Sequence, residues 1–175
     1  MKKILVIGAG RSAITLIRYL LENSLVYDWK VTVADVSEKL AKEAIGGHVK
    51  GRAIFFDVMN NDQRSVEIAK SDIVVSMLPA FMHIMVAKDC IRLQKNLVTA
   101  SYVSKQISSL DEEAKKSGVL LLNEIGLDPG IDHMSAMQII DEIKAKGGEI
   151  TSFKSFCGGL VHPDYDNNPW HYKFT

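Results

Sequence analysis

The chain has 175 residues and carries 21 Lys and Arg residues against 21 Asp and Glu residues, so its formal net charge at pH 7 is zero. Hydrophobic residues make up 47% of the chain and charged residues 24%, a composition that excludes a disordered or collagen-like protein. A balanced charge without a run of Lys or Arg also excludes the basic footprint of a nucleic-acid-binding protein.

Cysteine content and the N-terminal segment bear on location. Two cysteines, Cys90 and Cys157, do not suffice for a disulfide framework, which favours a reducing compartment. The apolar run near the N-terminus covers only residues 4–7, which is too short for the core of a signal peptide. No stretch approaches the roughly 18 apolar residues of a membrane span. We therefore expect a cytoplasmic protein without a membrane partner.

Short apolar or β-branched runs alternate with stretches of helical period over most of the chain. The runs predict six strands, at residues 4–7, 30–35, 53–56, 73–75, 96–99 and 119–122. Between them, helical patterns occupy residues 14–21, 37–44, 62–70, 82–93 and 104–116. This repeated alternation, with right-handed crossovers, predicts an α/β fold with a doubly wound parallel sheet.

The pattern changes after the sixth strand. The sequence GLDPG at residues 126–130 predicts a turn, with Asp128 as the N-cap and Pro129 just inside the start of a helix that runs from residue 131 to residue 146. Alternating apolar and polar residues then predict a strand over residues 149–157. The tail has no period, which indicates the start of a truncated second α+β domain. The expected division is a first domain at 1–125, a connecting turn and helix at 126–148, and the incomplete domain at 149–175.

The first turn carries the sequence Gly8-Ala9-Gly10-Arg11-Ser12-Ala13, a G-x-G-x-x-A motif between the first strand and the first helix. The first glycine permits a tight turn, the second lets the backbone approach a pyrophosphate, and the alanine allows close helix–strand packing. Exposed N–H groups at the helix start attract the anion. We interpret the fold as a dinucleotide-binding Rossmann fold. The alternative is a tight turn without a ligand.

An acidic residue, Asp35, ends the second predicted strand 22 residues after Ala13. Its carboxylate can accept hydrogen bonds from a ribose with free hydroxyls, whereas a 2′-phosphate there would face a like charge. This pattern favours NAD over NADP, and the alternative is an ordinary solvated loop aspartate. Asp57 follows the third strand and has two interpretations, a bond to the adenine amino group or a cap within its own loop.

The segment Ser76-Met77-Leu78-Pro79 lies at the carboxyl end of the fourth strand, beside the point where the strand order reverses. We expect it to border the nicotinamide ribose, and a plain strand-to-helix turn is the alternative. Thr99, Ser101 and Tyr102 follow the fifth strand at the same edge of the sheet. Their hydroxyl groups are therefore predicted to converge on the same crevice.

The remaining residue types argue against other chemistry. The five histidines show no i, i+4 pair and no cysteine partner at zinc spacing, so we expect no metal site. Cys90 fits a small core residue, whereas Cys157 either lines a pocket or packs in the core. The sequence contains no G-x-S-x-G motif, which argues against a hydrolase.

Residues 123–133 (NEIGLDPGIDH) resemble a segment of the glutamate-forming saccharopine dehydrogenases, also called saccharopine reductases. Shorter matches to the N-terminal portion of that family support the resemblance over essentially the whole chain: the glycine motif, residues 76–79, His83, residues 101–102, residues 157–160 and residues 172–174. The resemblance implies an enzyme of lysine metabolism that oxidises saccharopine to glutamate and 2-aminoadipate semialdehyde, or runs the reverse reaction. A secondary amine would lose hydride to a nicotinamide cofactor, and water would hydrolyse the resulting imine.

The resemblance also implies roles for individual residues. By position, residues 9–12 would hold the pyrophosphate and residues 76–79 would flank the cofactor, with Ser101, Leu127 and Pro129 near it. Substrate contacts would come from Ser101, Tyr102, Asp128 and Cys157. The general acid/base that acts on the amine proton and the water would be one of Tyr102, Asp128, His133 and Lys173.

Two features depart from the family pattern. Fungal NADP-using members resemble Ala-Cys-Arg where this chain has Ala34-Asp35-Val36, so Val36 replaces the arginine that would meet a 2′-phosphate. We therefore expect NAD as the main cofactor, with NADP as the other option. Family members are also much longer, which implies that these 175 residues bind nucleotide but turn over slowly or not at all by themselves. An unpaired strand edge at residues 150–156 predicts that this strand either pairs with a second copy, which would give a homodimer, or is mobile.

Two alternatives stay open from the sequence alone. A related imine-forming amino-acid dehydrogenase, such as the carboxynorspermidine type, would share the Rossmann start and the imine chemistry. A nucleotide-binding regulatory module would bind the cofactor and transfer no hydride.

Overall fold

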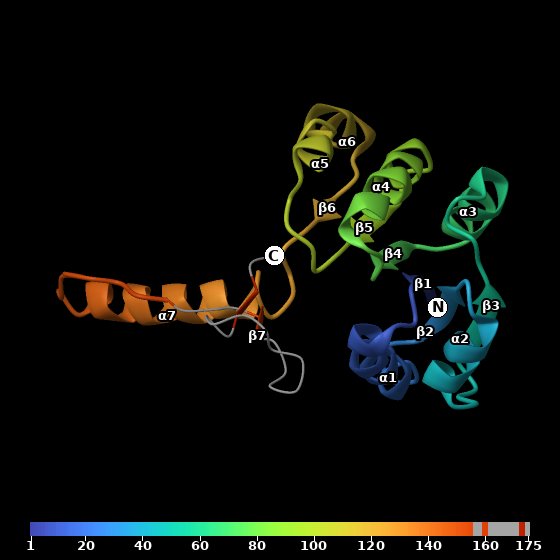
Figure 1. Cartoon of the computed structure of the whole chain (residues 1–175), viewed down its shortest axis with the longest axis horizontal. Coiled ribbons are helices and arrows are strands. Elements are labelled where there is room, and N and C mark those ends of the chain that lie inside the picture. Colours follow the sequence, from blue (N-terminus) through green and yellow to red (C-terminus); the bar gives the residue numbers. More distant parts are fainter. Residues whose placement is uncertain (156–158, 161–171, 174–175) are drawn as a thin grey trace. The chain divides into compact units, whose positions relative to one another are not determined.

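A computed structural model describes residues 1–155, 159–160 and 172–173 (Figure 1). The chain divides into two compact units, Met1–Gly130 and Ile131–Thr175. Among the helices of the described ranges, none combines the length and the apolar character that crossing a membrane requires.

The first unit contains a six-stranded parallel sheet with the strand order β3-β2-β1-β4-β5-β6 (Figure 1). The order reverses between β1 and β4, which is the switch point of a doubly wound sheet, so the predicted α/β fold is confirmed. The strands are β1 (Lys2–Ile7), β2 (Trp29–Asp35), β3 (Gly51–Phe55), β4 (Ile73–Ser76), β5 (Asn96–Val98) and β6 (Leu121–Leu122).

Helices connect the strands and fall into two groups. In one group α1 contacts α2, and in the other α3, α5 and α6 contact α4. The helices are η1 (Arg11–Ala13), α1 (Ile14–Glu22), α2 (Glu38–Ile45), α3 (Asn61–Ala69), η2 (Ala80–Met82), α4 (His83–Arg92), α5 (Lys105–Ser108) and α6 (Asp111–Ser117), of which η1 and η2 are 3-10 helices.

The central strand β1 shows why helices are needed on both faces of the sheet. Leu5 and Ile7 belong to a hydrophobic cluster completed by α3, α4, α5 and α6, whereas Ile4 and Val6 belong to a second cluster completed by α1 and α2. Because successive side chains of a strand point to opposite faces, an uninterrupted apolar run is buried on both sides.

The register brings the functional loops to one edge of the sheet. Ile7 of β1 is paired with Ala34 of β2 and with Ser76 of β4, so the carboxyl ends of these strands lie level. The segments that begin at Gly8 and Asp35 therefore leave the sheet side by side, at the switch point.

The predicted helix over residues 104–116 is wrong in one respect, because the segment forms two helices, α5 and α6. The hydroxyl of Ser109 donates to the carbonyl of Gln106, and the N–H of Leu110 donates to the carbonyl of Ile107. Local bonds of this kind compete with the regular α-helical pattern and interrupt it.

The second unit contains α7 (Ile131–Ala145), as predicted, and the antiparallel strands β7 (Gly159–Leu160) and β8 (Tyr172–Lys173). The predicted strand over residues 149–157 is wrong for residues 149–155, which form no strand. Residues 156 and 157 lie outside the described residues. Alternation creates an apolar face but supplies no neighbouring strand, and within the described ranges no segment pairs with residues 149–155.

The prediction that Asp128 caps this helix is also wrong. The helix begins at Ile131, three residues after Asp128, so Pro129 precedes the helix and does not lie just inside its start as predicted. The turn before it closes through a bond from the N–H of Gly126 to the carbonyl of Pro129, and the Asp128 carboxylate accepts a hydrogen bond from Tyr102 instead.

Candidate functional site

A cavity of about 400 Å³ lies at the carboxyl ends of β1, β2, β3 and β4, where open α/β sheets bind ligands. We call it the crevice. The charged side chains that line it in the described structure are two carboxylates, Asp35 and Asp57. The structure gathers these and other candidate residues from four separate loops; those that line the crevice are Gly8, Gly10, Asp35, Val36, Asp57, Leu78 and Pro79.

The two glycines of the first loop serve different purposes. Gly8 has a φ of +106°, and a Cβ there would lie 2.9 Å from the carbonyl oxygen of Met77, so a side chain does not fit. At Gly10 a Cβ would meet nothing within 4 Å, and no side chain caps the helix start at this residue. Arg11 and Ser12, which follow at the helix start, are exposed residues, and uncapped N–H groups at a helix start can bind an anion.

Asp35 ties the end of β2 to the glycine loop. Its Oδ2 accepts a hydrogen bond from the N–H of Ala9 at 2.7 Å, and its Oδ1 accepts one from the N–H of Ser37 at 2.8 Å. The side chain is thus fixed at the rim of the crevice rather than loose in solvent. Each carboxylate oxygen has a second lone pair, so Asp35 can still accept a ribose hydroxyl.

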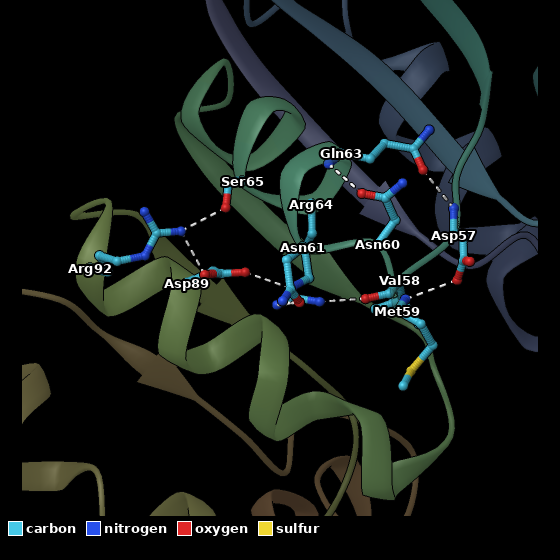
Figure 2. Close-up of polar contacts among 10 residues, drawn as sticks. All are labelled: Asp57, Val58, Met59, Asn60, Asn61, Gln63, Arg64, Ser65, Asp89 and Arg92. Atoms are coloured by element: carbon cyan, nitrogen blue, oxygen red, sulfur yellow. Dashed lines mark hydrogen bonds and ion pairs between the residues drawn. The ribbon is translucent and has the colours of Figure 1, made fainter.

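Asp57 has a local role of the kind its alternative interpretation predicted. Its Oδ1 accepts a hydrogen bond from the N–H of Met59 at 2.9 Å, and its own N–H donates to Oε1 of Gln63 at 2.9 Å (Figure 2). The amide of Gln63 also donates to the carbonyl of Phe55. These bonds shape the loop after β3 that forms one wall of the crevice.

A buried ion pair between α3 and α4 is hydrogen-bonded to the same loop (Figure 2). Arg64 of α3 pairs with Asp89 of α4, and both residues are less than a tenth exposed. Arg64 also donates to the carbonyl of Val58, which lines the crevice, and Arg92 donates to the other oxygen of Asp89 at 2.6 Å. None of the sequence motifs predicted this network, although an aspartate directly before Cys90, a predicted core residue, was a usable signal.

Beyond β4, polar side chains gather around His83, the first residue of α4. Its Nδ1 lies 2.8 Å from Oγ of Ser76 and its Nε2 lies 2.8 Å from Oγ of Ser101. Thr99 Oγ1 lies 3.3 Å from the same Nε2. Burial lowers the pKa of His83, so the ring is neutral at neutral pH.

Two candidate catalytic residues that lie 26 positions apart meet after β5 and β6. The hydroxyl of Tyr102 donates to Oδ1 of Asp128 at 3.1 Å. Glu124, which the sequence analysis missed, braces this region, because its N–H donates to the carbonyl of Ser101 and its carboxylate accepts from the N–H of Val103.

Other predicted site residues are placed less completely. Leu127 is exposed and Pro129 is buried, on either side of Asp128. His133 belongs to the second unit, where its Nδ1 lies 2.7 Å from Oδ1 of Asp132. For Lys173 the structure describes only the backbone in β8, and Cys157 lies outside the described residues.

Two family models match this chain. Residues 4–122 match the saccharopine dehydrogenase NADP binding domain, and residues 126–175 match the saccharopine dehydrogenase C-terminal domain. Together they cover the Rossmann unit and the segment that follows it.

Curated relatives agree with these models. The chain is 40% identical over 174 residues to the NADP(+), L-glutamate-forming saccharopine dehydrogenase of Pyricularia oryzae, which covers 99% of this chain and 38% of the relative. The corresponding enzyme of Saccharomyces cerevisiae is 39% identical over 175 residues, with the same coverage. An alpha-aminoadipic semialdehyde synthase of Arabidopsis thaliana is 47% identical over 148 residues, 85% of this chain and 14% of the relative. The chain thus spans well under half of these proteins.

Solved structures show the same likeness. The apo saccharopine dehydrogenase (L-Glu forming) of Saccharomyces cerevisiae matches with a TM-score of 0.83 and 38% identity, over 100% of this chain and 38% of that one. The 3-ketoreductase KijD10 of Actinomadura kijaniata matches at 20% identity with a TM-score of 0.63, over 85% of this chain and 46% of that one, which shows the shared fold alone. On the two family models and these relatives, the chain belongs to the saccharopine dehydrogenase family.

Proposed function

We propose that this chain is the dinucleotide-binding part of an oxidoreductase that acts on the CH–NH group of saccharopine and yields glutamate and 2-aminoadipate semialdehyde. The observation that carries the proposal is the crevice at the switch point, with an open helix start at Gly10 and a carboxylate at Asp35. The names of the fungal relatives supply the substrate class, an amino acid.

The residues of the crevice fit a dinucleotide. The glycine loop leaves room for a pyrophosphate, and Ala9, Gly10, Arg11 and Ser12 would hold it. Asp35 would accept the ribose hydroxyls, while Ser76, Leu78 and Pro79 would flank the nicotinamide half. When bound, the cofactor would accept a hydride from the carbon that carries the amine.

We propose NAD as the preferred cofactor, although the matching fungal relatives are named for NADP(+). The charged crevice side chains are two carboxylates, and Val36 rather than a cation follows Asp35. A 2′-phosphate would add negative charge beside them, which is unfavourable wherever water is excluded. Calorimetric titration with NAD and NADP tests this proposal, and equal affinity or tighter binding of NADP would contradict it.

The proton chemistry is assigned to Tyr102 and Asp128, with Lys173 as a further catalytic candidate. The hydrogen bond between Tyr102 and Asp128 supports their acting as a pair that holds and returns the amine proton. Ser101, Tyr102, Asp128 and Cys157 would contact the substrate. Formation of reduced dinucleotide from saccharopine, measured on the protein at its natural length, tests the activity.

Further properties belong to the same proposal. We propose a homodimer in the cytoplasm, and slow or absent turnover by these 175 residues alone, because they span 38% of the fungal enzymes. Light scattering and cell fractionation test the first two properties, and a turnover assay tests the third. The proposed division of the chain is 1–125, 126–148 and 149–175, which limited proteolysis tests.

A further inference from the structure

His83 joins hydroxyl groups at the ends of two neighbouring strands. Its Nδ1 contacts Ser76 at the end of β4, and its Nε2 contacts Ser101 and Thr99 after β5. His83 is 3% exposed and Ser76 is 1% exposed, whereas Ser101 is half-buried. Ser101 is therefore the accessible end of this chain of hydrogen bonds.

The directions of these bonds follow from the ring's charge. A neutral imidazole has one N–H donor and one acceptor nitrogen, so it cannot offer the same role to both serines. Within the described residues, the hydroxyl of Ser76 has one partner, Nδ1 of His83. A buried hydroxyl hydrogen without an acceptor is costly, and the buried Thr99 hydroxyl competes for the lone pair of the ring from the Nε2 side. Ser76 lies 2.8 Å from Nδ1 and Thr99 lies 3.3 Å from Nε2, so the stronger bond is the one in which Ser76 donates to Nδ1 and the ring proton lies on Nε2.

We propose that His83 is a positioning residue whose Nε2–H donates to Ser101 and so leaves the Ser101 hydroxyl hydrogen free to bind a carboxylate of the amino-acid substrate. This inference rests on the proposed function and names a specific role within it. Neither the dinucleotide motif nor the Tyr102–Asp128 pair supplies that role.

The backbone around Ser101 supports a fixed donor. The N–H of Ser101 donates to Thr99 Oγ1 at 3.3 Å, and its carbonyl accepts from the N–H of Glu124 at 3.1 Å. The residue that follows is Tyr102, which is bonded to Asp128. With both backbone groups engaged, the side-chain hydroxyl is the polar group of Ser101 that remains for a ligand.

Nitrogen-15 NMR of the imidazole tests the tautomer without any ligand. We expect a protonated Nε2 and an unprotonated Nδ1 for His83 at neutral pH, with the resonances assigned through the variant His83→Gln. Ser76→Ala should shift the Nδ1 resonance and Ser101→Ala the Nε2 resonance. The opposite tautomer, or a doubly protonated ring, would overturn the inference.

Three substitutions then test the effect on ligand affinity in the protein at its natural length. Glutamine can place an amide donor near the position of Nε2, asparagine reaches only the Nδ1 side, and phenylalanine replaces neither nitrogen. We expect His83→Phe and His83→Asn to weaken saccharopine binding about tenfold, and His83→Gln to stay within about threefold of the wild type. Dinucleotide affinity should change less than about twofold in all three. If the phenylalanine variant fails to fold, the glutamine–asparagine pair still carries the test.

His48→Phe is a matched control. This half-buried histidine lies in the connection between α2 and β3, at the amino ends of the strands, where its Nδ1 accepts the N–H of Lys50. It should alter neither affinity. A wild-type protein that binds no saccharopine contradicts the proposed function, while the tautomer remains measurable. A wild-type protein that binds it no better than His83→Asn does overturns the role of His83.

Discussion

The carboxyl edge of the sheet has two halves, the crevice and the neighbouring ends of β4 and β5, and different kinds of bond hold them in place. On the half formed by β1, β2 and β3, the carboxylate of Asp35 accepts the backbone N–H groups of Ala9 and Ser37. On the half formed by β4 and β5, the ring of His83 holds the hydroxyl of Ser101. In the first half, therefore, the bonds fix the backbone, whereas in the second half side chains fix one another.

This difference predicts different responses to substitution. Where the backbone is held by buried charge or by a steric limit, a single change should cost folding free energy. Where side chains hold one another, the same size of change should alter ligand affinity before it alters the fold.

The largest effect is expected at the buried ion pair that is bonded to the β3 wall. Asp89→Asn leaves the buried Arg64 guanidinium without its carboxylate, and we expect the free energy of unfolding to fall by about 3 kcal/mol in urea titration. Arg64 also donates to the carbonyl of Val58, in the loop after β3 that would face the adenosine half of the dinucleotide. The loss of affinity should therefore be as large for ADP-ribose, which lacks the nicotinamide, as for the whole dinucleotide.

An exposed ion pair provides the control for that prediction. Nζ of Lys42 lies 2.8 Å from Oε1 of Glu38 on α2, and both side chains are exposed. Because exposed ion pairs contribute little to stability, Lys42→Ala should leave the unfolding transition nearly unchanged. If Asp89→Asn also left the free energy of unfolding unchanged, the buried pair would not stabilise the wall.

The sequence predicted the backbone-held half better than the side-chain-held half, for a physical reason. A glycine motif indicates a backbone φ that other residues avoid, and an acidic residue at a strand end indicates a site for a carboxylate. Both are local features, and the structure has Gly8 at a positive φ and Asp35 bonded to the glycine loop. The contact of His83 with Ser76 and Ser101 depends on how three elements pack, which no local pattern records. The wrong prediction of a strand at residues 149–155 has a similar reason, because a strand needs a neighbouring strand and a local pattern does not record one.

A smaller loss of stability is expected at the glycine loop. Gly8→Ala places a Cβ 2.9 Å from a backbone carbonyl at a φ of +106°, and we expect a loss of about 2 kcal/mol in thermal or urea unfolding. Gly10→Ala is the matched control, because a Cβ there meets nothing within 4 Å. It should fold like the wild type yet bind dinucleotide more weakly. Equal stability of the two variants would contradict the steric argument.

Cofactor preference should respond to charge beside Asp35. Val36 is 70% exposed, and Val36→Arg would supply a bidentate partner for a 2′-phosphate. We expect the ratio of NADP to NAD affinity, measured by calorimetry at fixed ionic strength, to rise about tenfold. Val49→Arg, at an 84% exposed position between α2 and β3, adds the same charge and should leave the ratio unchanged. A ratio that rises equally in both variants would indicate a general charge effect.

The smallest effect is expected from the titration of His83 on the side-chain-held half. Burial lowers the pKa of the folded ring, so below the ordinary value of about 6.5 the unfolded chain binds more protons than the folded one. The stability linked to the neutral ring is therefore complete above that pH and declines as the pH falls toward the folded pKa. His83→Gln lacks this titration. The stability difference between the wild type and this variant should therefore shrink between about pH 7.5 and about pH 5 in urea titration. A difference that stays constant over that range would mean that the ring titrates alike in both states and is not buried as the structure describes.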